Sequence, residues 1–176
     1  TFSQEVQLAP AGSGPVDWIV GGYYFRDNTD FDTTIDVGTR TVSNGIQGVL
    51  TRSWAVFGQG SYDITDSLSL TLGGRFSKDI KSVDLAPSAL AGAVTLPVTP
   101  FSRKDSWSKF TPSAILEYSF GDSLAYAKFA RGFKSGGYNY PAVGQNPLNP
   151  EVLDMYELGY KGQLFDRAVR LTLSAY

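Results

Sequence analysis

Apolar and polar side chains alternate along most of this chain. Between residues 68 and 76 the odd positions are polar, glycine or arginine, and the even positions are Leu68, Leu70, Leu72, Gly74 and Phe76. Residues 54–62 alternate in the same way, with Trp54, Val56 and Tyr62 of one parity. A period of two gives an extended strand one apolar and one polar face, so both segments are predicted to be β-strands.

The alternating segments come in pairs that flank short, polar or glycine-rich turns. The four predicted hairpins join residues 2–8 with 18–25, 52–63 with 68–79, 107–120 with 124–133, and 153–163 with 168–176. Three long polar stretches connect one hairpin to the next, and they are predicted to be loops at 27–50, 81–106 and 134–152. We therefore predict an all-β, antiparallel fold of about eight strands in four hairpins.

Short turns that alternate with long loops are typical of a transmembrane β-barrel. The predicted strands are long enough to span a bilayer when tilted, a length of about 9–11 residues. Aromatic residues gather near both strand ends, as side chains at lipid–water interfaces do. They are Tyr62, Tyr118, Phe120, Tyr126, Tyr160 and Phe165 near the short turns, and Phe25, Trp54, Phe76, Trp107 and Phe110 near the long stretches. The chain is thus predicted to form all or part of such a barrel.

Charged side chains within the strands indicate which face avoids lipid. Lys128 lies in the middle of its strand, where a lipid-facing charge costs about 2–4 kcal/mol. Its side chain is therefore predicted to face the barrel lumen, while Ala127 and Phe129 face lipid. The predicted lumen-lining residues are Arg75, Glu117, Lys128, Glu157, Lys161 and Arg170. They fit the ordinary polar lining of a barrel, or contacts with a plug or a passing substrate.

Composition excludes several classes of function. The chain has 176 residues, 15 Lys and Arg against 17 Asp and Glu, and a net charge of −2, which does not suit nucleic-acid binding through a basic surface. It contains no His and no Cys, so a Ser-His-Asp triad, a thiol nucleophile and most zinc sites are excluded within it. We predict no enzyme activity, no catalytic residues and no cofactor. Asp27, Asp30, Asp32 and Asp36 could attract a hard cation, but their spacing does not match a calcium loop, so no metal site is predicted.

Several segments resemble the barrel of TonB-dependent outer-membrane receptors, the siderophore receptors in particular. The most specific are Asn149-Pro-Glu151, Tyr156-Glu-Leu-Gly-Tyr-Lys161 and Arg170-Leu-Thr-Leu-Ser-Ala-Tyr176. Residues 2–8 with 18–25, 55–75 and 126–139 are similar to other hairpins of that family. The resemblance implies that the chain is part of a barrel of about 22 strands. The plug domain, the TonB box and the C-terminal strands of the family are not found in residues 1–176.

The resemblance also implies a function for the intact protein, in the outer membrane of a Gram-negative bacterium. It would bind a ferric siderophore or a similar scarce nutrient and import it with energy from TonB, transmitted through the plug. Outer-membrane lipid and TonB would be its partners. Cationic and aromatic side chains in or beside the long stretches suit an anionic ferric chelate. The candidate substrate-binding residues are Arg103, Lys104, Lys134, Tyr138 and Tyr140.

Two other interpretations stay open at this point. Eight strands could close into a small self-contained barrel that acts as a passive pore or a structural adhesin. An outer-membrane barrel enzyme is a weaker alternative, because the chain has no His. The chain begins without Met and ends at Tyr176 within a predicted strand, so we expect it to be a piece of a longer protein.

Overall fold

The computed structural model describes residues 1–12, 16–30, 32–37, 40–91, 94–96, 100–138 and 146–176. Within these, only the backbone is described for 32–37, 40–47, 85–91 and 94–96. No helix in the described part of the chain is long and apolar enough to cross a membrane.

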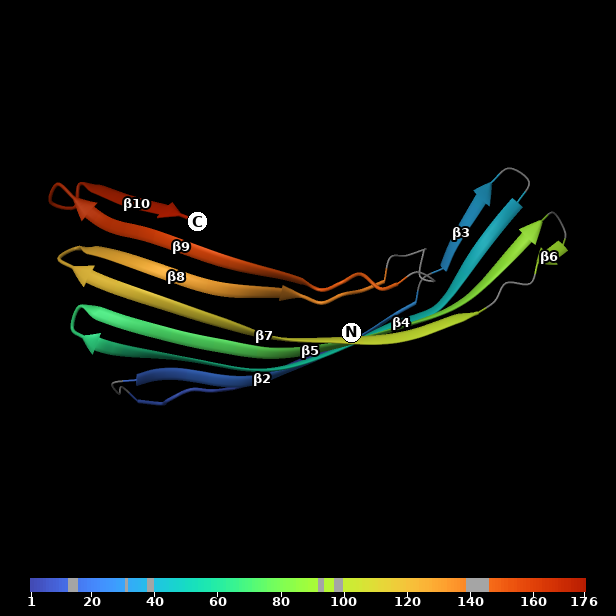
Figure 1. Ribbon diagram of the computed structural model, residues 1–176, viewed down its shortest axis with the longest axis horizontal. Coiled ribbons are helices and arrows are strands. Elements are labelled where there is room, and N and C mark those ends of the chain that lie inside the picture. Colours follow the sequence, from blue (N-terminus) through green and yellow to red (C-terminus); the bar gives the residue numbers. More distant parts are fainter. Residues whose placement is uncertain (13–15, 31, 38–39, 92–93, 97–99, 139–145) are drawn as a thin grey trace.

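All ten strands belong to one antiparallel sheet (Figure 1). The strands are β1 (Phe2–Leu8), β2 (Val16–Thr29), β3 (Asp32–Val37), β4 (Arg40–Thr65), β5 (Leu68–Ala91), β6 (Val94–Leu96), β7 (Phe101–Phe120), β8 (Ser123–Lys134), β9 (Glu151–Leu164) and β10 (Val169–Ala175). Eight of them lie in the order β1-β2-β4-β5-β7-β8-β9-β10, while β3 pairs with β4 and β6 pairs with β5. Consecutive strands of this eight-strand path are therefore neighbours in the sheet.

The four predicted hairpins are confirmed. β1 pairs with β2, β4 with β5, β7 with β8, and β9 with β10. The turns between β4 and β5, β7 and β8, and β9 and β10 lie at one end of the sheet, here called the turn end (Figure 1). β3 and β6 lie at the opposite end, here called the outer end. The alternation of short and long connections thus corresponds to two distinct ends of one sheet.

Two of the three predicted long loops are largely strand. β2 continues to Thr29 and β4 begins at Arg40, and β5 continues to Ala91 while β7 begins at Phe101. The prediction of loops at 27–50 and 81–106 was therefore wrong. Polar residues and Gly interrupt the apolar–polar alternation in both stretches, as Pro does in 81–106, and so favour a loop, although hydrogen bonding between neighbouring strands continues. The third stretch contains one isolated bridge, between Gly137 and Leu148.

The eight main strands do not close into a barrel. β1 and β10 are the two edges of the sheet and do not pair with each other. The interpretation as a small closed barrel is therefore not supported by the fold. An open edge leaves unpaired backbone N–H and C=O groups, which favours addition of further strands.

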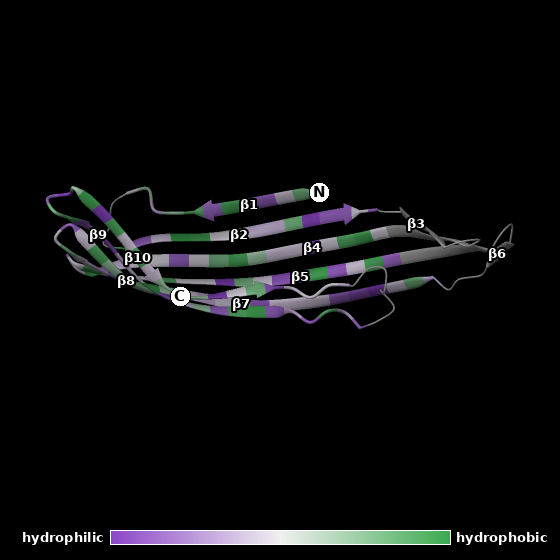
Figure 2. Ribbon diagram, turned by 90° about the horizontal axis from the view of Figure 1, so that it is seen from above, coloured by the Kyte–Doolittle hydropathy of each residue, from purple (hydrophilic) through white to green (hydrophobic). Residues whose placement is uncertain are grey.

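The sheet is a single layer, and hydrophilic and hydrophobic residues follow one another along its strands (Figure 2). Among described residues only two apolar side chains are buried, Ala55 and Val83, so no core covers either face. Directly paired residues share a face, and the pairs Val56–Phe76 and Phe76–Phe110 place large apolar side chains together. This apolar face carries most of the large exposed hydrophobic side chains, among them Val56 (55% exposed) and Phe110 (56%). Leaving them in water is unfavourable, so the face requires an apolar surrounding.

Aromatic residues on the apolar face form two rows. The row near the turn end consists of Trp18, Tyr62, Tyr118, Phe120 and Tyr160, and the outer row consists of Phe2, Tyr24, Trp54, Phe76, Phe110, Phe129 and Tyr156. Ring contacts join neighbours within each row, for example Tyr118 to Phe120 at 5.7 Å and Trp54 to Phe76 at 5.7 Å. Tyr62 and Trp54 are separated by about 27 Å of strand, close to the height of a lipid-facing apolar band.

Three residues predicted for these aromatic rows lie on the opposite face. Each of them is directly paired with a residue of the polar face. The pairs are Phe25–Ser53, Trp107–Asp79 and Tyr126–Glu117. Proximity to a strand end was therefore insufficient to assign them to the lipid interface, because the face depends on register.

Candidate functional site on the polar face

The six residues predicted to line a lumen all lie on the polar face. The register links them through the pairs Arg75–Thr111, Glu117–Tyr126, Lys128–Glu157 and Gln163–Arg170, together with Lys161–Thr172. Directly paired residues share a face, and these pairs follow one another from strand to strand. The six side chains therefore project from the same side of the sheet. That this side encloses a lumen stays a prediction.

Arg75 occupies the middle of the polar face between two aromatic rings. Its guanidinium carbon lies 5.5 Å from the Tyr23 ring centroid and 5.6 Å from that of Phe57. Its Nε donates a hydrogen bond to the Ser77 hydroxyl at 3.0 Å. Cation–π contacts of this kind hold the guanidinium in place while its remaining N–H donors stay available.

A second polar group lies closer to the turn end. The Tyr126 hydroxyl donates to the Glu157 carboxylate at 2.7 Å, and the Lys161 ammonium lies 5.3 Å from the Tyr126 ring centroid. Tyr126 is paired with Gly159, and the Tyr126 ring occupies the space that a side chain at Gly159 would fill. The missing Cβ therefore lets the tyrosine lie flat across β9 and reach Glu157.

The outer cluster, defined as Lys81, Arg103, Asp105, Trp107 and Tyr138, is the most elaborate polar group. Lys81 and Asp105 are directly paired on β5 and β7. Arg103 donates from Nε to Asp105 at 2.7 Å, and the Tyr138 hydroxyl lies 2.9 Å from the Asp105 carboxylate and 3.0 Å from the Lys81 carbonyl. Trp107 lies beneath both Lys81, at 5.9 Å from ammonium to ring centroid, and Tyr138, at 6.5 Å between ring centroids.

Residues 136–138 cross the polar face at this cluster. The Lys81 ammonium donates to the Gly136 carbonyl at 2.8 Å, and Leu148 donates from its backbone N–H to Gly137 at 2.8 Å. Gly136 is buried, and a Cβ there would overlap the Trp107 indole and the Leu148 carbonyl. The glycine is thus required for the close approach of this segment to β7.

The outer cluster keeps its charge pattern over a wide pH range. It lies beyond the outer aromatic row, outside the apolar band. Hydrogen bonding from Arg103 lowers the pKa of Asp105, with a smaller contribution from Tyr138. Burial, followed by hydrogen bonding to Asp105, raises the pKa of Tyr138 to about 12. Asp105 therefore stays ionised and Tyr138 stays a neutral donor at physiological pH.

The five predicted substrate-binding residues are not all brought together. Arg103 and Tyr138 meet in the outer cluster. Lys104 pairs with Ser82 and so projects from the apolar-face side of the sheet, away from them. Lys134 ends β8 and faces Glu151 at 3.5 Å, with both side chains about three-quarters exposed, at 77% and 74%. Tyr140 lies outside the described residues.

Three members of the outer cluster were missed as site residues: Lys81, Asp105 and Trp107. Lys81 and Asp105 fall within a stretch predicted as a loop, and Trp107 was assigned to an interface row. The parity of Arg75, Ser77, Asp79 and Lys81 continues unbroken, so extending the alternation past the predicted strand end would have placed Lys81 with Arg75.

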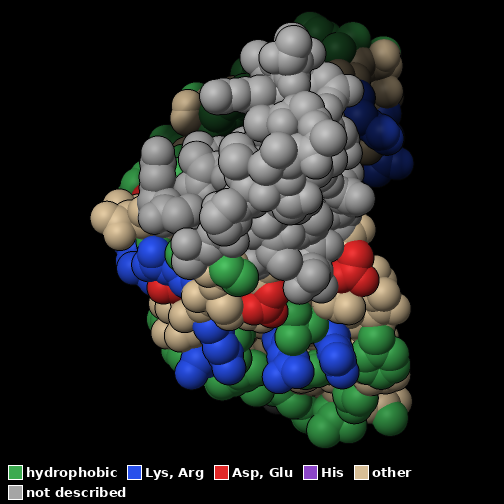
Figure 3. All heavy atoms as spheres, turned by 90° about the vertical axis from the view of Figure 1, so that its right-hand side faces the viewer, with side chains coloured by type: hydrophobic (Ala, Val, Ile, Leu, Met, Phe, Trp, Pro, Cys, Tyr) green, Lys and Arg blue, Asp and Glu red, His purple; other side chains and the backbone are tan. Residues whose placement is uncertain are grey.

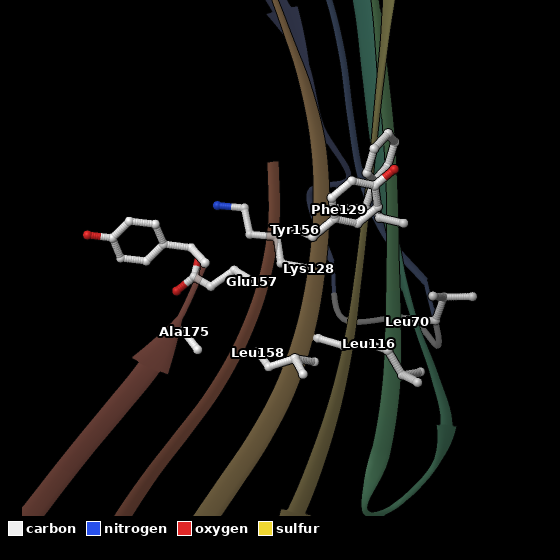
Figure 4. Close-up of a pocket in the computed structure, with 11 residues that line it drawn as sticks. Leu70, Leu116, Lys128, Phe129, Tyr156, Glu157, Leu158 and Ala175 are labelled. Carbon is white, nitrogen blue, oxygen red and sulfur yellow. The ribbon is translucent and has the colours of Figure 1, made fainter. Parts of the chain in front are cut away.

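One hollow on the described surface is mainly apolar and does not suit a charged ligand. Its volume is about 540 Å³, and it lies where β10 ends beside β9. Leu116 and Leu158 line it, and Lys128 and Glu157 border it with side chains that point to the other side of the sheet (Figure 4). Among described residues no group of three or more acidic side chains could hold a metal ion, and the Asp32 and Asp36 side chains lie outside the described part.

Comparison with known proteins agrees with this architecture. The structure of the ferric yersiniabactin uptake receptor FyuA from Yersinia pestis is similar, with a TM-score of 0.77 and 22% sequence identity. The match covers 92% of this chain and 26% of that receptor, so the chain spans about a quarter of its length. The family profile described as TonB dependent receptor-like, beta-barrel, matches residues 1–176. A match over every residue, together with a single-layer, two-faced antiparallel sheet, shows that this chain belongs to the TonB-dependent receptor β-barrel family.

Proposed function

We propose that the chain forms part of the wall of an outer-membrane receptor in a Gram-negative bacterium. The receptor binds a ferric siderophore or a similar scarce nutrient at its outer end and imports it with energy from TonB. The observation that carries this proposal is the two-faced sheet, whose exposed apolar face with two aromatic rows suits a bilayer, within a family match over the whole chain.

The outer cluster supports the binding step. Lys81 and Arg103 supply positive charge, and Trp107 and Tyr138 supply aromatic faces within one group. Ammonium, guanidinium and aromatic groups together bind an anionic chelate with aromatic or hydroxamate-like donors through charge-assisted hydrogen bonds and stacking. The proposed substrate-binding residues are still Arg103, Lys104, Lys134, Tyr138 and Tyr140, of which Arg103 and Tyr138 belong to the outer cluster.

The polar face supports the passage step. Arg75, Glu117, Lys128, Glu157, Lys161 and Arg170 line the interior and contact a plug domain or the moving substrate. No bond of the substrate is made or broken by these residues. TonB acts through the plug, which residues other than 1–176 contribute.

The test is uptake of radiolabelled iron chelates by cells that express the full-length protein as their sole such receptor. Binding should survive a protonophore, whereas import should stop, because TonB uses the inner-membrane proton gradient. Lys81→Gln and Trp107→Ala should each weaken chelate binding about tenfold, whereas Arg131→Gln on the apolar face should not. Import that continues with the gradient collapsed would contradict the proposal and favour a passive pore.

A further inference from the structure

Three cationic side chains lie together on the apolar face, at the outer edge of the outer aromatic row. This basic row consists of Arg26 on β2, Arg52 on β4 and Lys78 on β5. Arg26 and Arg52 are directly opposite each other, and Lys78 is paired with Trp54, two residues from Arg52 along β4. Seen from the outer end, several Lys and Arg side chains gather beside a rim of hydrophobic side chains (Figure 3).

The basic row has no anionic partner within the described part of the chain. Asp27 and Asp79 are its sequence neighbours, but both belong to the polar face, where Asp27 accepts from Thr29 at 2.7 Å and Asp79 accepts from Ser53. Asp84, on the same face as Lys78, lies six residues further out and accepts from Ser102 at 2.6 Å. Two arginines directly opposite each other repel, so their juxtaposition is unfavourable without a bound anion.

Another arginine on the same face shows the contrast. Arg131 on β8 also lies beyond the outer aromatic row, and it forms a two-pronged ion pair with Asp154 at 2.6 Å. The carboxylate of Asp154 thus neutralises Arg131, whereas no carboxylate among the described residues pairs with the basic row.

The position of the row matches the headgroup region of a bilayer. Arg26 and Arg52 lie two residues, about 7 Å, beyond Tyr24 and Trp54 of the outer aromatic row. Aromatic rows mark the lipid–water interface, and Lys and Arg stems extend along apolar surface to place their charges at the level of lipid phosphates. We infer that the basic row is a binding site for the phosphate groups of anionic lipid headgroups in the leaflet at the outer end. This inference rests on the proposed membrane location.

The residue types suit this ligand. A guanidinium binds two phosphate oxygens at once, and two facing guanidiniums on adjacent strands reach one phosphate from both sides. Lys78 adds a third positive charge on the next strand. Trp54 packs against Phe76 at 5.7 Å and holds the base of the site. The bound phosphate removes the repulsion between Arg26 and Arg52.

The test uses Trp54 as a reporter in the full-length protein reconstituted into phospholipid bilayers. Quenching of its fluorescence is compared for brominated phosphatidylglycerol, which is anionic, and brominated phosphatidylcholine, which has no net charge. The Trp54 signal is taken as the difference between wild type and Trp54→Phe. Neutralising one cation should lower the preference for phosphatidylglycerol about fivefold, and the combined Arg26→Gln, Arg52→Gln and Lys78→Gln variant should show no preference.

The control variant combines Arg131→Gln with Asp154→Asn, which removes one cation and one anion from the same face. It should keep the wild-type preference. The inference is overturned if the triple variant keeps its preference, if the control loses it equally, or if the wild type shows none while phosphatidylcholine still quenches Trp54. Absence of quenching by either lipid would overturn the membrane location as well, so the two failures are distinguishable.

Discussion

The Tyr138 hydroxyl lies 2.9 Å from the Asp105 carboxylate and donates a hydrogen bond to it, although 33 residues separate the two along the chain. The bond attaches the segment after β8 to the polar face of β7, close to the Lys81 ammonium. Asp105 thereby contacts both Arg103, a cation from its own strand, and Tyr138, a neutral donor from the segment after β8. Positive and aromatic groups are held together at the outer end as a consequence.

Removing the Tyr138 hydroxyl should loosen this attachment. Tyr138→Phe removes the single O–H donor that lies within reach of both Asp105 and the Lys81 carbonyl, while keeping the ring against Trp107. One lost hydrogen bond is worth about 1 kcal/mol, so amide exchange at Gly136 to Tyr138 should accelerate about fivefold. Tyr118→Phe, on the apolar face, is the matched control and should leave exchange at those residues unchanged. Equal exchange in wild type and Tyr138→Phe would show that the hydroxyl does not anchor the segment.

Tyr138 should titrate far above an ordinary tyrosine. Its pKa is raised to about 12, first by burial and then by the hydrogen bond to Asp105. The neutral phenol is favoured in the folded state, so its stabilising contribution is complete below pH 10 and is lost as the pH rises through about 12. The measurement is tyrosinate absorbance of the wild type minus that of Tyr138→Phe.

Asp105→Asn separates the two causes of this shift. Removing the carboxylate should lower the Tyr138 pKa, yet it should stay above 10 because burial is the larger cause. A Tyr138 titration midpoint near pH 10 in the wild type would show that the hydroxyl is neither buried nor bonded to Asp105.

Gly159 should not tolerate a side chain. Alanine there would overlap the Tyr126 ring, displace it, and separate its hydroxyl from Glu157. Overpacking of this kind costs about 1–3 kcal/mol. Gly132→Ala is the matched control, because its nearest neighbours are 3.8 Å or more from the added Cβ. Urea unfolding of the reconstituted protein should show a lower stability for Gly159→Ala only. Equal unfolding midpoints for the two variants would show that the Tyr126 ring does not lie against Gly159.

The turn between β9 and β10 carries backbone strain. Phe165, Asp166 and Arg167 have φ angles of 55°, 52° and 71°, a left-handed run of non-glycine residues. Phe165→Gly relieves the Cβ clash, whereas Phe165→Ala removes the ring and keeps the clash. The glycine variant should therefore be more stable than the alanine variant by about 1 kcal/mol in the same unfolding assay. Greater stability of the alanine variant would mean that the turn is not strained at Phe165.

The sequence by itself determined the strands between the two aromatic rows. Alternation at Leu70, Leu72 and Phe76 is a local property, because one face needs apolar surroundings and the other does not. The hairpins, the polar parity of Lys128 and Glu157, and the family resemblance follow from residues that are close together or regularly spaced. A local pattern of period two determines a face before any partner strand is known.

Only the tertiary structure decided the outer end. Polar residues, Gly and Pro interrupt the alternation in the stretches at this end, so the sequence did not predict β3, β6 or the extensions of β4 and β5, whereas backbone pairing continues the sheet there. The register separates Arg103 from Lys104 onto opposite faces and brings Arg26 opposite Arg52. Tyr138, Asp105 and Lys81 meet because a segment after β8 returns across two earlier strands. Such contacts depend on how distant residues align, and the alternation along one strand does not show which residues of another strand lie beside it.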